Sequence, residues 1–190
     1  MSLAVKLCQS CHISWSRLKS ELVELLQQSA VEHLTAFRQL EAQEFSSVFG
    51  IVTTDFEALY AYKCGEYQRC LLLSTRNVRA LIAFDGISRI FTYPEFIQLM
   101  DDELVSLIGL TLIVDPTCRD LIPRHALVRQ LPLSLYLMTQ CQIKLHHPVT
   151  SLTQILDDIK IVRRDLYLKE LLDQLLLKLA ERKIQTATHQ

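Results

Sequence analysis

Glycine is scarce in this sequence. Its 190 residues include four glycines, and these are widely spaced, at positions 50, 65, 86 and 109. A nucleotide-binding phosphate loop, a dinucleotide-binding G-x-G-x-x-G motif and the G-x-S-x-G motif of hydrolases all need glycines at short spacing. These motifs are absent, so the sequence does not support a common nucleotide-binding fold or a serine hydrolase.

Excess charge and long apolar runs are also missing. The 20 Lys and Arg residues balance 21 Asp and Glu residues, so no chain-wide field attracts nucleic acid or an anionic membrane. The longest strongly apolar run, residues 104–114, is about half of the ~20 residues that span a bilayer, and it predicts a buried helix. Residues 1–7 lack the apolar stretch of a signal peptide, and six cysteines are too few for a disulfide scaffold. We therefore expect an intracellular protein, cytoplasmic or nuclear, with no membrane partner.

The pattern of apolar residues favours helices throughout. Leucine is abundant, β-branched residues are scattered, and no alternating run is bounded by hairpin turn pairs. With 49% hydrophobic side chains, the chain is long enough for one substantial core. We expect a single all-α domain over residues 1–190, part of a larger protein. It would consist of antiparallel helix pairs, stacked as a short repeat-like array or arranged as an irregular bundle, with residues 1–13 and 184–190 as frayed ends.

Capping boxes place several helix starts. In this motif a Ser or Thr and the Glu or Gln three residues later satisfy free backbone N–H groups. Three pairs match it: Thr54 with Glu57, Thr92 with Glu95, and Ser151 with Gln154. They predict a helix over 56–63, followed by another over 67–84. Pro132 either kinks a helix over 124–145 or starts a new one.

One stretch resembles a known repeat. Residues 58–71 read ALYAYKCGEYQRCL. They resemble the turn region of a tetratricopeptide repeat, in which a Gly, an acidic residue and a Tyr join two helices. Ala58 and Cys70 match positions where that repeat has small residues, whereas Thr54 and Ala61 depart from its larger ones. The resemblance implies a right-handed stack of helix pairs whose concave face binds a peptide or another protein. A second helix, turn and helix are expected over 133–159.

The C-terminal helix is rich in leucine. It is expected over 165–183 and contains eight leucines: Leu166, Leu168, Leu171, Leu172, Leu175, Leu176, Leu177 and Leu179. These are too many for one stripe of about 100° that faces a single core. Either this helix lies in the middle of the fold, or its second face binds a partner, a second copy of the chain or another part of a longer chain. Leu172 and Leu176 are then the contact residues.

No local signature marks a catalytic residue or a cofactor site. We therefore expect a non-enzymatic scaffold or adaptor that binds a protein or peptide on a helical surface and needs no cofactor. Aromatic and Arg side chains often anchor interfaces. The candidate binding residues near the helix-pair turn are Tyr60, Lys63, Tyr67 and Arg69.

Nucleic-acid binding is the first alternative. The densest basic stretch comprises Lys160, Arg163, Arg164 and Lys169. No aromatic platform that could stack on bases is interleaved with it, and a solvated loop and helix start is the better explanation of such a stretch. RNA is therefore an unfavoured partner.

A metal or redox role is the second alternative. Cys8, Cys11 and His12 form a C-x-x-C-H motif, which is the spacing that attaches a c-type haem and is also half of a zinc site. No second pair follows at zinc-finger spacing, so we interpret these cysteines as a structural or incidental pair. The acidic cluster at 101–103 stands at an expected helix start, where negative charge complements the helix dipole without any metal.

Overall fold

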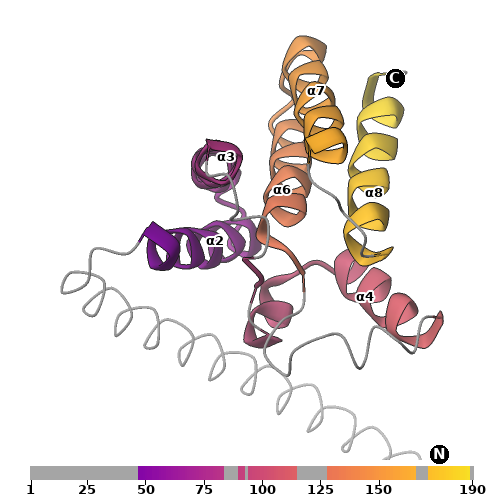
Figure 1. The fold of residues 1–190 in the computed structure, drawn as a ribbon. Coiled ribbons are helices and arrows are strands. Elements are labelled where there is room, and N and C mark those ends of the chain that lie inside the picture. Colours follow the sequence, from indigo (N-terminus) through magenta and orange to yellow (C-terminus); the bar gives the residue numbers. More distant parts are fainter. Residues whose placement is uncertain (1–46, 84–89, 93, 115–127, 166–170, 189–190) are drawn as a thin grey trace, which may run out of the picture. The chain divides into compact units, whose positions relative to one another are not determined.

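The structure is a computed structural model, and it describes residues 47–83, 90–92, 94–114, 128–165 and 171–188 (Figure 1). All of these belong to the second of the two units into which the chain divides, Ser46–Gln190. Every regular element in these ranges is a helix, and the extended structure in them is limited to one isolated antiparallel bridge between Phe91 and Arg129. The all-α prediction is confirmed.

The described elements follow one another along the chain as α2 (Ser47–Lys63), α3 (Tyr67–Ala83), the 3-10 helix η1 (Pro94–Leu99), α4 (Asp102–Val114), α6 (Gln130–Lys144), α7 (Val149–Asp165) and α8 (Leu171–Thr188). Helix α6 packs against α2, α3, α7 and α8. Of its 15 residues, 13 are buried, so the core is built around this helix. Figure 1 shows α4 at the lower end of α8, against which it packs.

The turn between α2 and α3 matches the sequence prediction. Gly65 has a φ of 78°, in the left-handed region that glycine adopts without strain. The Glu66 N–H donates to the carbonyl oxygen of Ala61 at 2.8 Å, and the Gly65 N–H donates to that of Tyr62 at 3.1 Å. These two bonds form a Schellman motif, which satisfies carbonyl groups at the end of α2.

Small residues line the contacts that α3 makes. Ala58 on α2 and Cys70 on α3 are both fully buried, as expected where helices cross closely. The influence of the Cys70 thiol, together with burial, raises the pKa of the Cys141 thiol on α6. Helix α3 therefore packs against both its own hairpin partner, α2, and α6.

Helices α6 and α7 form a second hairpin with the same type of turn. His146 takes the place that Gly65 has in the first hairpin, with a φ of 52°. The His147 N–H donates to the Gln142 carbonyl oxygen at 2.9 Å, and the His146 N–H donates to that of Ile143 at 3.1 Å. The helix, turn and helix predicted over 133–159 are therefore present.

The three predicted capping boxes are wrong. Thr54 lies inside α2, and its hydroxyl donates to the carbonyl oxygen of Gly50 at 2.6 Å. Ser151 lies inside α7. Thr92 precedes η1, but its backbone N–H donates to the carbonyl oxygen of Val128 at 2.7 Å. A Ser or Thr hydroxyl can bond a helical carbonyl as readily as a free N–H, so the spacing alone does not mark a helix start.

The start of α6 and the end of α8 test two further predictions, on Pro132 and on the frayed C-terminal residues. Pro132 lies in the first turn of α6, where a backbone N–H has no helical acceptor, so the helix starts around the proline and is not kinked by it. Helix α8 continues to Thr188, beyond the predicted end at 183, and the frayed end expected from residue 184 is wrong because Ile184 is fully buried. No helix in the described ranges combines the length and apolarity needed to cross a membrane.

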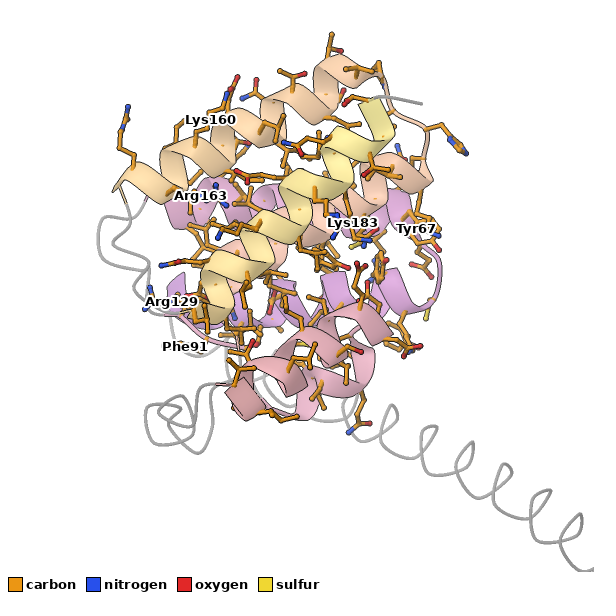
Figure 2. All side chains as sticks on the ribbon, turned by 90° about the vertical axis from the view of Figure 1, so that its right-hand side faces the viewer. Tyr67, Phe91, Arg129, Lys160, Arg163 and Lys183 are labelled. Carbon is orange, nitrogen blue, oxygen red and sulfur yellow. The ribbon has the colours of Figure 1, made fainter. Side chains whose placement is uncertain are left out.

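A buried ion pair anchors the start of α6. The Arg129 Nε lies 3.1 Å from Oδ2 of Asp173 in the first turn of α8, and both side chains are largely buried. The Arg129 guanidinium also lies 5.7 Å from the centre of the Phe91 ring (Figure 2). Next to it, the Gln130 N–H donates to the carbonyl oxygen of Ile90 at 2.9 Å. The segment before η1, the start of α6 and the start of α8 are thereby joined.

Candidate functional site

Helix α4 begins with a side-chain cap. The Leu104 N–H donates to Oδ1 of Asp101 at 2.8 Å, and Asp102 and Glu103 occupy the first turn. A carboxylate at this position satisfies a free N–H and interacts favourably with the helix dipole. The acidic cluster therefore has the structural role that the sequence predicted.

The cap of α4 also belongs to a polar network with α2 and α6. The other oxygen of Asp101, Oδ2, accepts hydrogen bonds from the hydroxyls of Tyr136 at 2.8 Å and Tyr62 at 3.4 Å. The Gln140 amide nitrogen donates to the Tyr136 hydroxyl at 2.6 Å. Burial, followed by the charge of Asp101, raises the pKa of both tyrosines far above the usual value, so both remain hydrogen-bond donors.

A salt bridge fixes the same end of α4 to α8. The Lys183 Nζ lies 2.5 Å from Oε2 of Glu103, and this oxygen also accepts a weaker hydrogen bond from Tyr136 at 3.4 Å. Figure 2 shows Lys183 on α8. The N-terminal turn of α4 is therefore held by side chains from three other helices.

The two faces of α4 differ sharply in exposure. Leu104, Ile108 and Thr111 are buried. The opposite face, which we call the α4 apolar face, is exposed at Val105 (37%), Leu110 (59%), Ile113 (69%) and Val114 (73%). No charged residue follows Glu103 in this helix. The prediction that residues 104–114 form a buried helix is therefore right for one face and wrong for the other, because α4 packs mainly against α8.

The aromatic residues predicted to bind a partner, Tyr60 and Tyr67, lie near the α2–α3 turn, and each contacts another aromatic ring. The Tyr60 ring stacks on Phe56 with 6.3 Å between centroids. The Tyr67 ring meets Tyr62 edge-on at 5.7 Å. Both predicted residues are half-buried, so part of each ring supports the hairpin itself.

The charged residues predicted beside them are more exposed. Lys63 is exposed, and Arg69 lies 3.1 Å from Glu66 and 3.7 Å from Glu57 in two ion pairs. The structure thus brings the four predicted residues to one turn. A ligand there would compete with carboxylates for the guanidinium of Arg69.

Neither of the two leucines predicted as partner contacts on α8, Leu172 and Leu176, is exposed. Leu176 is fully buried, so its assignment as a partner-binding residue is wrong and it belongs to the core. Leu172 is half-buried, and no described leucine of α8 is exposed. Helix α8 packs against α4, α6 and α7, and this accounts for leucines on more than one of its sides.

The described residues offer little support for either alternative, nucleic-acid binding or a metal or redox role. Lys160 pairs with Asp157 at 2.8 Å and Arg163 pairs with Glu181 at 2.7 Å, which reduces the positive field of the basic stretch (Figure 2). Lys169, like the Cys8, Cys11 and His12 motif, lies outside the described residues. Among those described, no group of three or more His, Cys, Asp and Glu residues is arranged to hold a metal ion.

One buried carboxyl belongs to none of the surfaces discussed above. Asp55 on α2 is fully buried, and neither of its side-chain oxygens has a hydrogen-bond partner in the described structure. Burial raises the pKa of Asp55 well above its usual value. Because no solvent reaches this group, we assign it no part in binding.

Comparison with known proteins gives no guide to the site. No protein-family model, no curated protein and no solved structure matches this chain. The α4 apolar face is the feature that reasoning from the sequence missed. Its signal was the absence of charge over 104–114, but an apolar stretch with no polar side does not indicate which residues remain exposed.

Proposed function

We propose that this chain is a non-enzymatic protein-interaction module that binds a partner protein through the α4 apolar face. The observation that carries this proposal is the exposure of Leu110, Ile113 and Val114, each 59% or more, on the part of α4 that follows Glu103 and carries no charge. Single exposed leucines are ordinary on protein surfaces, but adjacent large apolar side chains mark interaction sites. Burial of these side chains is the source of affinity.

The way α4 is held supports this proposal. Asp101 caps the helix, and Tyr136 and Lys183 tie its first turn to α6 and α8. A partner would therefore meet an ordered helix, and binding would not have to order the face first. Such preorganisation lowers the entropic cost of association.

We also propose that the two hairpins form a helical-repeat-like scaffold. The supporting observations are the shared Schellman turns at Gly65 and His146 and the packing of α3 against both α2 and α6. In this scaffold the turn residues Tyr60, Lys63, Tyr67 and Arg69 form a secondary contact surface. The free thiols of Cys64, Cys70 and Cys141 suit a reducing compartment, the cytoplasm or nucleus.

The test compares two charged substitutions at similarly exposed positions. Ile113→Asp alters the α4 apolar face, whereas Leu72→Asp on α3, where the native side chain is 71% exposed, serves as the matched control. Wild type and both variants would be used as baits in lysate after their thermal unfolding is shown to be equal. A protein that binds wild type and Leu72→Asp but not Ile113→Asp is the expected result. Identical binding to all three baits would contradict the proposal.

A further inference from the structure

Gly109 lies in the middle of α4, and no contact in the described structure requires a glycine at this position. Its backbone does not adopt the left-handed region, and a Cβ built at this position meets nothing within 4 Å. Glycine in a helix interior is less favourable than alanine, because it loses more conformational freedom on folding. The described structure therefore needs neither the flexibility nor the small size of this residue.

Gly109 interrupts the row of side chains on the α4 apolar face. Val105, Gly109 and Ile113 are spaced by four residues, so they lie in one line along the helix. Leu110 and Val114 form the adjacent line, together with Ser106. The missing side chain lets the backbone of another helix approach closely at this point, since the distance between packed helices depends on the residues at their crossing.

The row is symmetric about Gly109. In an antiparallel pair of α4 helices that cross at Gly109, Val105 of each copy meets Ile113 of the other copy. The two glycines then face each other at the closest approach. A two-fold interface requires this kind of match, because the same surface must complement itself.

The charge distribution favours the same arrangement. The charged residues of α4 are Asp102 and Glu103, both in its first turn, so pairing of the remaining face buries no charge. A parallel pair would bring the acidic turns of both copies together. An antiparallel pair separates them by roughly the helix length of ~20 Å, beyond the ~8 Å screening length at physiological salt. A formal net charge of −1 leaves little repulsion between whole chains.

We infer that the partner at the α4 apolar face is a second copy of this chain, with its α4 antiparallel and crossing at Gly109. This inference rests on the proposed function of that face. A standard interface has roughly 20–30 residues per side, whereas this face has four large exposed ones. The dimer is therefore weak and reversible, and its population depends on protein concentration.

Sedimentation of the full chain over a concentration series tests the inference. We expect the wild-type mass to rise from 21.9 kDa towards twice that value. Ile113→Asp should weaken self-association at least tenfold by placing a charge in the interface, and Gly109→Leu should do so by filling the crossing point. Leu72→Asp should associate like the wild type.

Cross-linking tests the orientation. In an antiparallel pair, a mixture of Val105→Cys and Ile113→Cys chains forms more cross-linked dimer than either variant alone. If each variant cross-links alone as well as in the mixture, the antiparallel arrangement is wrong. The native cysteines contribute equally to all three samples, so the comparison removes their background.

The outcomes separate this inference from the proposed function. A wild type that stays monomeric at every concentration overturns the dimer, as does self-association that Ile113→Asp leaves unchanged. If such a monomeric wild type still binds another protein through Ile113, the proposed function stands and only the second copy is excluded. If Ile113→Asp affects neither self-association nor capture, both are wrong.

Discussion

Helices α6 and α4 show that the apolarity of a helix does not determine its burial. Helix α6 contains polar residues such as Gln130, Ser134 and Gln142, and these are buried together with its leucines. Helix α4 has no charged residue after Glu103, yet Leu110 and Ile113 are exposed. The difference lies in their neighbours, because α6 packs against four helices and α4 mainly against one. Among the described residues, apolar surface on α4 therefore remains exposed.

Introducing an aspartate into each of the two helices should show the largest difference in the free energy of unfolding. Leu133→Asp puts a carboxylate at a fully buried position of α6 and should lower the free energy of unfolding by at least about 4 kcal/mol, enough to unfold a marginal domain. Ile113→Asp in α4 should change it by less than about 0.5 kcal/mol. Urea denaturation followed by circular dichroism measures both. A large loss for Ile113→Asp would mean that the α4 face is covered in the native protein.

The ion pairs at the two helix starts offer a second contrast. Asp173→Asn leaves Arg129 buried beside a neutral side chain, and breaking such a buried pair costs about 3–5 kcal/mol. Glu103→Gln removes the more exposed pair with Lys183, for which we expect a loss of no more than about 1 kcal/mol. Denaturation of both variants at low and high salt checks the difference. Equal losses would show that the Arg129 pair is solvated.

The contact between α4 and α6 depends on Asp101. Asp101→Ala removes the cap of α4 and the acceptor for the hydroxyls of Tyr62 and Tyr136, and we expect a loss of about 2–3 kcal/mol. Asp101→Asn keeps a capping oxygen and should lose less. Tyr136→Phe, measured alongside, shows how much of the effect comes from the hydrogen bond to α6. If Asp101→Asn is as damaging as Asp101→Ala, the negative charge matters more than the cap.

The smallest expected effects concern glycine. At the end of α6, His146 has a φ of 52° that glycine adopts more easily, so His146→Gly should raise stability by up to about 1 kcal/mol. In α4, Gly109→Ala adds a Cβ in open space and should also stabilise the monomer, by about 0.5–1 kcal/mol. Thermal unfolding at low protein concentration measures both. Gly65→Ala is the control and should destabilise by about 1 kcal/mol, because its φ of 78° strains any other residue.

Local chemistry was predictable from the sequence, whereas burial was not. The pattern over 58–71 predicted a helix pair and its turn at Gly65, and the acidic residues near Asp101 predicted a helix start, because both depend on neighbouring residues in the chain. The caps at Thr92 and Ser151 were wrong: the Thr92 hydroxyl donates to the carbonyl oxygen of Val128, which is distant in sequence, and α7 begins two residues before Ser151. The positions of Leu176 in the core and Ile113 on the surface depend on which helices pack together, and leucine periodicity does not contain that information.

The buried carboxyl of Asp55 couples the fold to proton concentration. An acid whose pKa is raised on folding keeps its proton in the native chain and loses it in the unfolded chain once the pH exceeds the ordinary value of 3.8. Between that value and the native pKa, unfolding releases a proton, and each pH unit removes up to about 1.4 kcal/mol of stability. Asp55→Asn should abolish this release, which calorimetry in buffers of different ionisation enthalpy detects. A protein bearing such a group withstands acid better than its 21 carboxyl side chains alone suggest.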